Sequence, residues 1–181
     1  MISEPLRKIW RISMGDPYFE TTTVQHLKSV VPDSDQFRFR CTGCGNCCRG
    51  PGSVYFSDED MQNIQSFLGL NRTRFAALKQ RLIQARENGY HVHRTGGACY
   101  FLDQDNRCAI YPVRPLQCSS FPFWPSTFAS RAELEEVADD CPGTLSKAGE
   151  AHSLLQVARR VNRTRREFIA KQTNQNKLFM I

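Results

Sequence analysis

The chain has 181 residues, of which 40% are hydrophobic and 23% are charged, and this composition is typical of a globular protein of one domain. Its length allows a hydrophobic core that needs no disulfide bonds, and no run of about 20 apolar residues predicts a membrane span. The formal net charge of +6 weakly favours an acidic partner, because the excess positive charge is concentrated near the C-terminus.

Eight cysteines are unusual in a chain of this length. The first residues mix charged and hydrophobic side chains and do not resemble a signal peptide, and neither end carries a lipidation motif. We therefore expect a cytoplasmic protein. In a reducing cytoplasm, clustered cysteines bind metal more often than they form disulfides.

Four of the cysteines fall within residues 41–48 and are separated mainly by small residues. Thiolates are soft ligands that suit zinc, copper(I) and iron–sulfur clusters, and the C-x2-C spacing lets two sulfurs reach one ion from a single loop. Gly43 and Gly45 can adopt a positive φ, which lets the backbone turn around a metal. We interpret this segment as a metal-binding loop whose candidate ligands are Cys41, Cys44, Cys47 and Cys48.

We divide the chain into three parts. Residues 1–40 form a lead-in that packs on the domain, and the alternation in Phe37–Arg40 predicts a short strand running into the loop. Residues 41–145 form the cysteine-cluster metal-binding domain. Residues 146–181 form a basic C-terminal helix and tail.

Beyond the loop, Val54–Phe56 predicts a short strand, and Ser57 predicts the N-cap of a helix with acidic residues in its first turn. This helix ends at Gly69, and Asn71 caps a second helix that ends near Asn88. We expect both apolar stripes to face the core: Met61, Ile64, Phe67 and Leu68 in the first helix, and Phe75, Leu78, Leu82 and Ile83 in the second.

Residues 90–95 alternate and predict a strand with His91 and His93 on one face. An H-x-H pair on a strand can bind metal, although a solvated or hydrogen-bonded face is the more common role. A hairpin is expected next, with strands 98–102 and 107–111 joined by a turn. It carries Cys99 and Cys108, one in each strand.

Two prolines fix the approach to Cys118, and Phe121–Pro125 continues as a stiff aromatic segment that we expect to wrap over the metal site. Residues 131–138 predict a short helix, and Cys141 lies in the turn that follows. These elements predict the α+β class: a small cysteine-rich domain with short strands, a hairpin, several helices and a long C-terminal helix.

That last helix is predicted from Glu150 to Lys171, followed by a disordered tail at residues 172–181. A basic amphipathic helix can contact an acidic protein or nucleic acid, although docking on its own domain with a solvated basic face is the more common arrangement. Its apolar side comprises Leu154, Ala158, Val161 and Phe168, and its charge comes from Arg159, Arg160, Arg163, Arg165, Arg166 and Lys171.

The cysteine motifs resemble those of the YkgJ-type cysteine-cluster (CxxCxxCC) family, whose members are described as zinc- or iron-chelating domains. The resemblance covers roughly residues 40–145. It rests on four motifs in the same order: Cys41-x2-Cys44-Gly45-x-Cys47-Cys48, Cys99-x-Phe101-Leu102-Asp103, Cys108-x-Ile110-Tyr111-x2-Arg114-Pro115-x2-Cys118 and Phe121-Pro122-Phe123.

One residue departs from this pattern. The family has an arginine directly after the cysteine equivalent to Cys118, where this chain has Ser119. If that arginine pairs with the charge of a cluster or with an anionic partner, this chain has lost or relocated the contact.

The sequence is compatible with two kinds of metal site, a structural zinc and an iron–sulfur cluster. A structural zinc takes four ligands, usually two from each of two loops, and Cys41 and Cys44 make one such half. A [4Fe–4S] cluster also takes four thiolates, and Cys41, Cys44 and Cys47 with the distant Cys141 before proline outline the arrangement of bacterial ferredoxins. Adjacent Cys47 and Cys48 tend to point in different directions, so both joining one zinc would strain the loop.

Eight cysteines are enough for two four-cysteine sites, or for one site with spare buried thiols. The candidate metal ligands are Cys41, Cys44, Cys47, Cys48, Cys99, Cys108, Cys118 and Cys141. We expect a protein that chelates iron, as an iron–sulfur cluster, or zinc through these thiolates.

Two alternatives are an iron–sulfur-dependent redox or protein-modifying enzyme and a zinc-stapled interaction module. The enzyme alternative follows from a related cysteine cluster that is associated with flagellin lysine methylases. The chain has no glycine-rich cofactor loop and no C-x3-C-x2-C radical motif. No residue is assigned as a catalytic base, and the sequence leaves open whether the protein is an enzyme.

Overall fold

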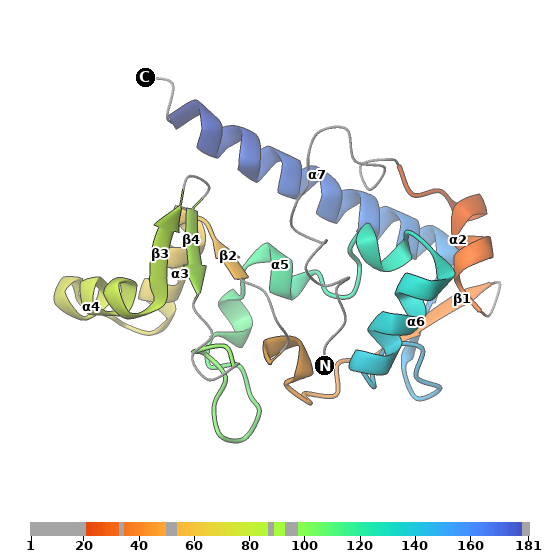
Figure 1. Ribbon diagram of the computed structural model, residues 1–181, viewed down its shortest axis with the longest axis horizontal. Coiled ribbons are helices and arrows are strands. Elements are labelled where there is room, and N and C mark those ends of the chain that lie inside the picture. Colours follow the sequence, from red (N-terminus) through yellow and green to blue (C-terminus); the bar gives the residue numbers. More distant parts are fainter. Residues whose placement is uncertain (1–20, 33–34, 50–53, 87–88, 93–97, 179–181) are drawn as a thin grey trace.

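The computed structural model describes residues 21–32, 35–49, 54–86, 89–92 and 98–178 (Figure 1). The side chains of residues 82–86, 89–92 and 171–178 are outside this description. The predicted lead-in residues Trp10, Ile12, Tyr18 and Phe19 lie outside the described residues.

The described part of the chain has the predicted α+β class, with six α-helices and two small antiparallel sheets. One sheet pairs β1 (Gln36–Phe39) with β5 (Glu150–Ser153), and the other has the order β2 (Val54–Phe56), β4 (Gly89–Val92), β3 (Ile83–Arg86). The helices are α2 (Val24–Val30), α3 (Asp58–Phe67), α4 (Arg72–Leu82), α5 (Leu116–Ser119), α6 (Arg131–Asp140) and α7 (Leu154–Leu178).

The larger of two hydrophobic clusters joins segments from both ends of the chain. Phe37 of β1 is fully buried at its centre, and the rings of Phe123 and Phe128 meet it edge-on, with centroids 5.8 and 5.1 Å away. Edge-to-face pairs of this kind add to the free energy gained from burial alone. Around them pack buried residues of α2, α6 and α7: Leu27, Val30, Val31, Leu134, Leu154, Val157, Ala158 and Val161.

Residues 150–153 form a strand, so the prediction of a single helix from Glu150 was wrong. They pair antiparallel with β1, which places His152 opposite Phe37. The helix begins only after Ser153, whose Oγ accepts a hydrogen bond from the N–H of Gln156 at 3.3 Å while Gln156 Oε1 accepts one from the N–H of Ser153 at 2.8 Å. This reciprocal pair is a capping box, which starts a helix by satisfying its first free N–H groups.

The prediction of a disordered tail from residue 172 was also wrong, because α7 continues from Leu154 to Leu178. Residues 172–178 contain no glycine or proline that would end a helix. In Figure 1, α7 runs from the end of the molecule that carries α2 and α6 toward the end that carries the three-stranded sheet. Despite its length, neither α7 nor any other helix of the described residues is apolar enough to cross a membrane.

The smaller hydrophobic cluster lies at the other end and includes cysteines. Its buried residues come from β2, α3 and the segment after residue 97, and Cys99, Cys108 and Cys118 pack against them. The predicted cap of α3 is confirmed: Ser57 Oγ accepts a hydrogen bond from the N–H of Asp60, whose carboxylate accepts one from the N–H of Ser57. The six buried residues of this cluster are Val54, Phe56, Met61, Ile64, Phe101 and Ile110.

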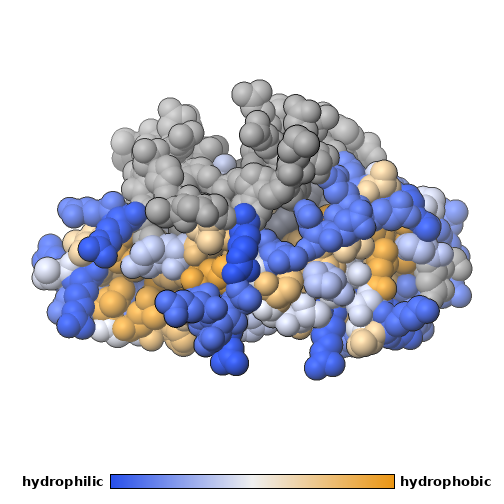
Figure 2. Space-filling model, turned by 60° about the horizontal axis from the view of Figure 1, so that its bottom comes forward, coloured by the Kyte–Doolittle hydropathy of each residue, from blue (hydrophilic) through white to orange (hydrophobic). Residues whose placement is uncertain are grey.

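Part of the expected core stripe lies at the surface instead. Met61 and Ile64 are buried as predicted, but 46% of Phe67 and 37% of Leu68 are exposed. Figure 2 shows hydrophobic residues gathered on the surface at this end of the molecule. The predicted cap of α4 is confirmed, since Asn71 Oδ1 accepts the N–H of Arg74 at 2.9 Å.

Helix α4 is shorter than predicted. It ends at Leu82, and Ile83–Arg86 pairs with β4 instead of extending the helix toward Asn88. Pairing with a neighbouring strand overrides a local helical pattern in such short segments. His91 lies in β4, opposite Tyr55 of β2 and Gln84 of β3, whereas His93 lies outside the described residues.

We predict that stability falls with acidification through His152. Burial, and next the charge of Arg160, lower the pKa of His152, while Glu150 acts in the opposite direction. Because the unfolded chain takes up this proton more readily than the folded one, the free energy of unfolding should decrease as the pH falls below the ordinary value of 6.5.

Urea denaturation between about pH 7.5 and 5.5 tests this pH dependence. We expect the decrease to be smaller in His152→Gln than in the wild type. Parallel pH profiles of the two proteins would contradict the assignment.

Candidate metal centre

The loop at residues 41–49 connects the two hydrophobic clusters, from the end of β1 to the start of β2. Gly43 and Gly45 have φ angles of +69° and +76°, as the predicted turn around a metal requires. Asn46–Cys48 then forms a single 3-10 turn, in which the Cys48 N–H donates to the Gly45 carbonyl at 2.9 Å. The two glycines therefore bend the chain so that its four thiols occupy one compact segment.

Hydrogen bonds fix this loop to two distant parts of the chain. On one side, the N–H of Cys99 donates to the carbonyl of Cys48 at 2.7 Å. On the other, Asn46 Nδ2 donates to the carbonyl of Asp140 at 2.9 Å, and the N–H of Arg40 donates to the carbonyl of Gly143 at 3.1 Å. The loop thus brings together the segments that carry the remaining cysteines.

The chain reverses its direction between Cys99 and Cys108, as predicted. In place of the two expected strands, an isolated β-bridge joins Leu102 and Cys108. Asp103 Oδ1 shapes the turn by accepting the N–H groups of Asp105 and Arg107 at 2.9 and 2.7 Å. Such side-chain acceptors compete with ladder pairing and favour a tight loop. Both cysteines are half-buried.

Cys118 is positioned by the short helix α5, which follows Pro115 as expected from the proline-rich approach. The N–H of Cys118 donates to the carbonyl of Pro115 at 2.9 Å. The neighbouring Gln117 ties this helix to β2, because its Oε1 accepts the N–H of Tyr55 at 3.0 Å, and Trp124 Nε1 donates to the Gln117 carbonyl at 3.0 Å.

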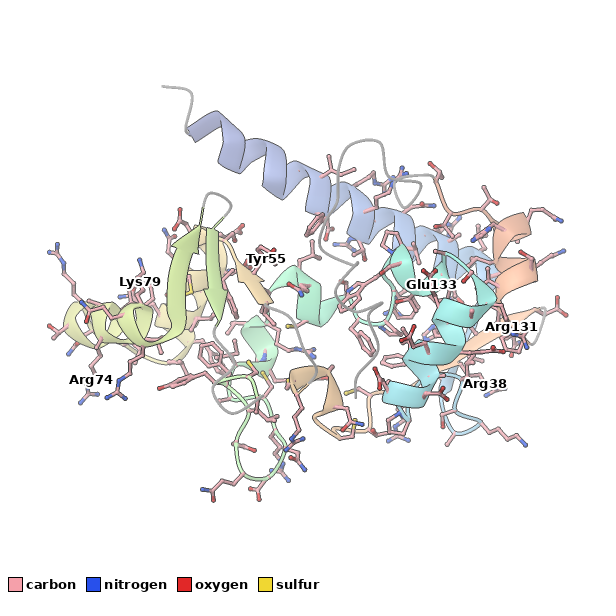
Figure 3. All side chains as sticks on the ribbon, in the orientation of Figure 1. Arg38, Tyr55, Arg74, Lys79, Arg131 and Glu133 are labelled. Carbon is pink, nitrogen blue, oxygen red and sulfur yellow. The ribbon has the colours of Figure 1, made fainter. Side chains whose placement is uncertain are left out.

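Five thiols form one neighbourhood, which we call the central thiol group: Cys47, Cys48, Cys99, Cys108 and Cys118. Hydrogen bonding with Cys47, and next with Cys99, raises the pKa of the Cys48 thiol. Burial raises the pKa of Cys108, and it raises the pKa of Cys118 to about 12. Cys48, Cys108 and Cys118 therefore hold their protons strongly unless a positive charge is bound among them. Figure 3 shows sulfur atoms in the middle of the molecule, between the three-stranded sheet and α6.

The other three cysteines, Cys41, Cys44 and Cys141, are called the peripheral cysteines. Cys141 is the C-cap of α6, where its N–H donates to the carbonyl of Val137 at 2.9 Å. The turn after it is pressed against Arg40 and Cys41, so closely that a Cβ on Gly143 would lie 2.0 Å from the Arg40 carbonyl oxygen. Cys44 completes the set and is half-buried.

The residues present fit a soft metal in their chemistry, since five sulfur donors lie together. Among the described residues, however, no three His, Cys, Asp or Glu side chains already stand in the arrangement of a metal site. Closure on an ion therefore requires these side chains to move, and thiol side chains rotate between staggered χ1 positions.

A cavity of about 810 Å³ opens beside the thiols, and Cys41, Cys47 and Cys118 line it. One face of α7 forms part of its wall, through Arg160, Arg163, Thr164 and Glu167. The sequence pattern predicted these arginines as part of a basic surface and gave no indication of the cavity. The spacing i, i+3, i+4 and i+7 of these four residues places them on one face, but the position of that face depends on long-range packing.

Residues 40–142 match the CxxCxxCC family, described as "Putative zinc- or iron-chelating domain". The chain belongs to this family. An uncharacterised protein of Methanocaldococcus jannaschii is 33% identical over 88 residues, which are 47% of this chain and 44% of that protein. The matched part thus spans less than half the length of this relative. No solved structure matches the chain.

The family match confirms the predicted resemblance to a zinc- or iron-chelating domain, and it includes all eight cysteines. The roles of the individual cysteines, and of His91 and His93, stay predictions.

We predict that Gly45→Ala destabilises the protein more than Gly43→Ala. Either substitution forces a side chain into the left-handed region, which costs about 1–2 kcal/mol. At Gly45 the new Cβ would also lie 2.7 Å from Arg49 Nη1 and 3.3 Å from the Asn106 Cβ, whereas nothing lies within 4 Å at Gly43.

Midpoints of urea denaturation measure the difference between the two variants. Equal midpoints for the two variants would show that the packing around Gly45 does not restrain the loop.

Proposed function

We propose that the protein chelates iron or zinc through the central thiol group. The observation that supports this most is that five thiols from three separate segments lie together, although only two of them are adjacent in sequence. A structural zinc and an iron–sulfur cluster each need four thiolates, and the central thiol group contains five thiols. When bound, the metal supplies positive charge that stabilises the thiolates and, if it is an iron–sulfur cluster, a centre for electron transfer.

Cys47, Cys99, Cys108 and Cys118 are the proposed ligand set, with Cys48 hydrogen-bonded beside it. The charges of Cys99, Cys47 and Cys108 all act on the Cys118 thiol, which is our reason to group these four. Because burial raises the pKa values of Cys108 and Cys118, binding a metal near neutral pH must release their protons.

The peripheral cysteines form a second proposed site, with a separate role. Cys41 and Cys141 lie near the C-terminal end of α6, and Cys47 lines the same cavity as Cys41. Together with Cys47, which the proposed central ligand set also uses, the three peripheral cysteines have the ferredoxin-like spacing in the sequence, which is our reason to favour iron over zinc. The three-part division of the chain and a cytoplasmic location also stay proposals.

A redox or protein-modifying enzyme is the second candidate function. The cavity beside Cys47 and Cys118 favours it, because a purely structural zinc site is closed and needs no adjoining space. A protein-interaction module that uses zinc only to stabilise its fold would not need this cavity.

We predict that removing two central thiols abolishes metal binding in the central site. Cys99→Ser/Cys118→Ser should lower the metal content per chain and the melting temperature, because metal binding and folding are coupled. Cys41→Ser/Cys44→Ser is the matched control, since it removes the same number of thiols from the peripheral site.

Elemental analysis after anaerobic purification measures both variants. If there are two sites, each double variant should keep the metal of the other site. Wild-type metal content in Cys99→Ser/Cys118→Ser would refute the proposed ligand set.

We also propose a salt-sensitive contact of α7 with an acidic protein or nucleic acid. Arg159 and Arg166 are exposed, while Arg163 is paired with Glu167, its Nε lying 2.6 Å from Oε1. Arg159→Glu/Arg166→Glu should therefore reduce the recovery of acidic partners in low-salt pull-downs without changing metal content. Unchanged recovery would show that these arginines are only a solvated face.

A further inference from the structure

The cavity beside the thiols has a positively charged lining. Its volume of about 810 Å³ lies within the range of pockets that hold metabolite-sized ligands. In a cleft, charges of one sign reinforce each other and attract an oppositely charged ligand. The charged residues of its described lining are four arginines and two glutamates: Arg40, Arg114, Arg160, Arg163, Glu150 and Glu167.

Arg160 is held in place without using its hydrogen-bond donors. Its guanidinium lies 4.3 Å from the centroid of the Phe123 ring. Phe123 is only 5% exposed, and the rings of Phe37, Phe39, Phe128 and His152 surround it, so the surface under Arg160 is rigid. The guanidinium of Arg160 forms no hydrogen bond or ion pair with the described residues. Because a guanidinium that packs face-on keeps its N–H groups at its edge, those groups remain available to an anion.

Arg114 is held in a similar way. Its guanidinium lies 3.5 Å from the centroid of the Tyr111 ring, and its Nε donates to the Tyr111 carbonyl at 2.8 Å. The two terminal nitrogens of Arg114 are not used in the hydrogen bond to Tyr111. The charge of Arg114 also partly offsets the rise in the pKa values of Cys108 and Cys118, so this arginine lies close to the thiols.

Arg163 differs from these two arginines, because its charge is already paired with Glu167. The lining is also partly aromatic, since Phe39, Tyr111 and Phe121 line the cavity. A ligand that fits such a lining combines a negatively charged group with an apolar body.

We propose that this cavity binds a small organic anion, whose phosphate or carboxylate group is bound by Arg114 and Arg160 and whose apolar part contacts the aromatic part of the lining. The bound anion lies next to Cys47 and Cys118. The proposal goes beyond metal chelation and does not depend on which metal the thiols hold. The competing role of the two arginines is only to offset the charge of metal-bound thiolates, which requires no ligand.

Calorimetric titration of the full chain tests the proposal with two anionic probes, phenyl phosphate and phenylacetate, and with neutral benzyl alcohol. We expect saturable binding of at least one anion with a Kd below about 1 mM, and none of the alcohol. The anion that binds more tightly identifies the charged group as phosphate or carboxylate. Absence of saturable binding of both anions would overturn the proposal.

Substitutions then locate the site. Arg160→Gln and Arg114→Gln should each weaken binding about tenfold or more, since each removes a charged hydrogen-bond donor. Arg160→Lys keeps the charge but loses the planar fork, so its effect should be smaller than that of Arg160→Gln. Arg166→Gln is the matched control, because Arg166 is exposed on the same helix and is not part of the described lining.

Metal content and circular dichroism of every variant are measured beside the titrations, so that failure of metal binding and failure of anion binding can be told apart. If Arg160→Gln does not fold, Arg114→Gln decides the outcome. Equal weakening by Arg166→Gln and the two cavity variants would show non-specific attraction to a basic protein and would overturn the proposal.

Discussion

The hydrogen bond from the Cys99 N–H to the Cys48 carbonyl joins the metal-binding loop to the segment that carries three further cysteines. The same junction connects the two hydrophobic clusters, since the loop leaves β1 in the larger cluster and leads into β2 in the smaller one. Cys99, Cys108 and Cys118 pack against the smaller cluster, so the proposed ligand set would couple metal binding to the stability of that half of the molecule.

Helix α7 serves both the core and the cavity. Leu154, Val157 and Val161 are buried in the larger cluster, while Arg160 lies over the ring of Phe123 and faces the cavity. Phe123 is the link, because its ring belongs to the core on one side and supports the arginine on the other. A change in the packing of α7 would therefore alter the charge beside the thiols as well as the stability of the core.

Local signals in the sequence predicted the local features correctly. Ser57 and Asn71 cap their helices, and Gly43 and Gly45 bend the metal-binding loop, because each depends on residues within a few positions. The strand at Glu150–Ser153 escaped prediction because its partner is β1, more than a hundred residues away. The sequence Ser153-x2-Gln156 has the pattern of a capping box, and this local signal indicates where α7 begins.

The candidate site shows the same limit. Spacing identified the eight cysteines and the family, but it did not separate the central thiol group from the peripheral cysteines, because that division depends on how the segments of Cys99, Cys118 and Cys141 fold back on the loop. The cavity was hidden for the same reason, since its walls come from β1, the loop, α5 and α7.

The central claim is that thiolates hold the metal, and X-ray absorption spectroscopy at the metal edge tests it most directly. The measurement is made on anaerobically purified protein, without added metal. We expect a first shell of sulfur atoms at about 2.3 Å from the metal, and a further shell of iron atoms if the metal is an iron–sulfur cluster. A first shell dominated by nitrogen or oxygen at about 2.0–2.2 Å would contradict the account.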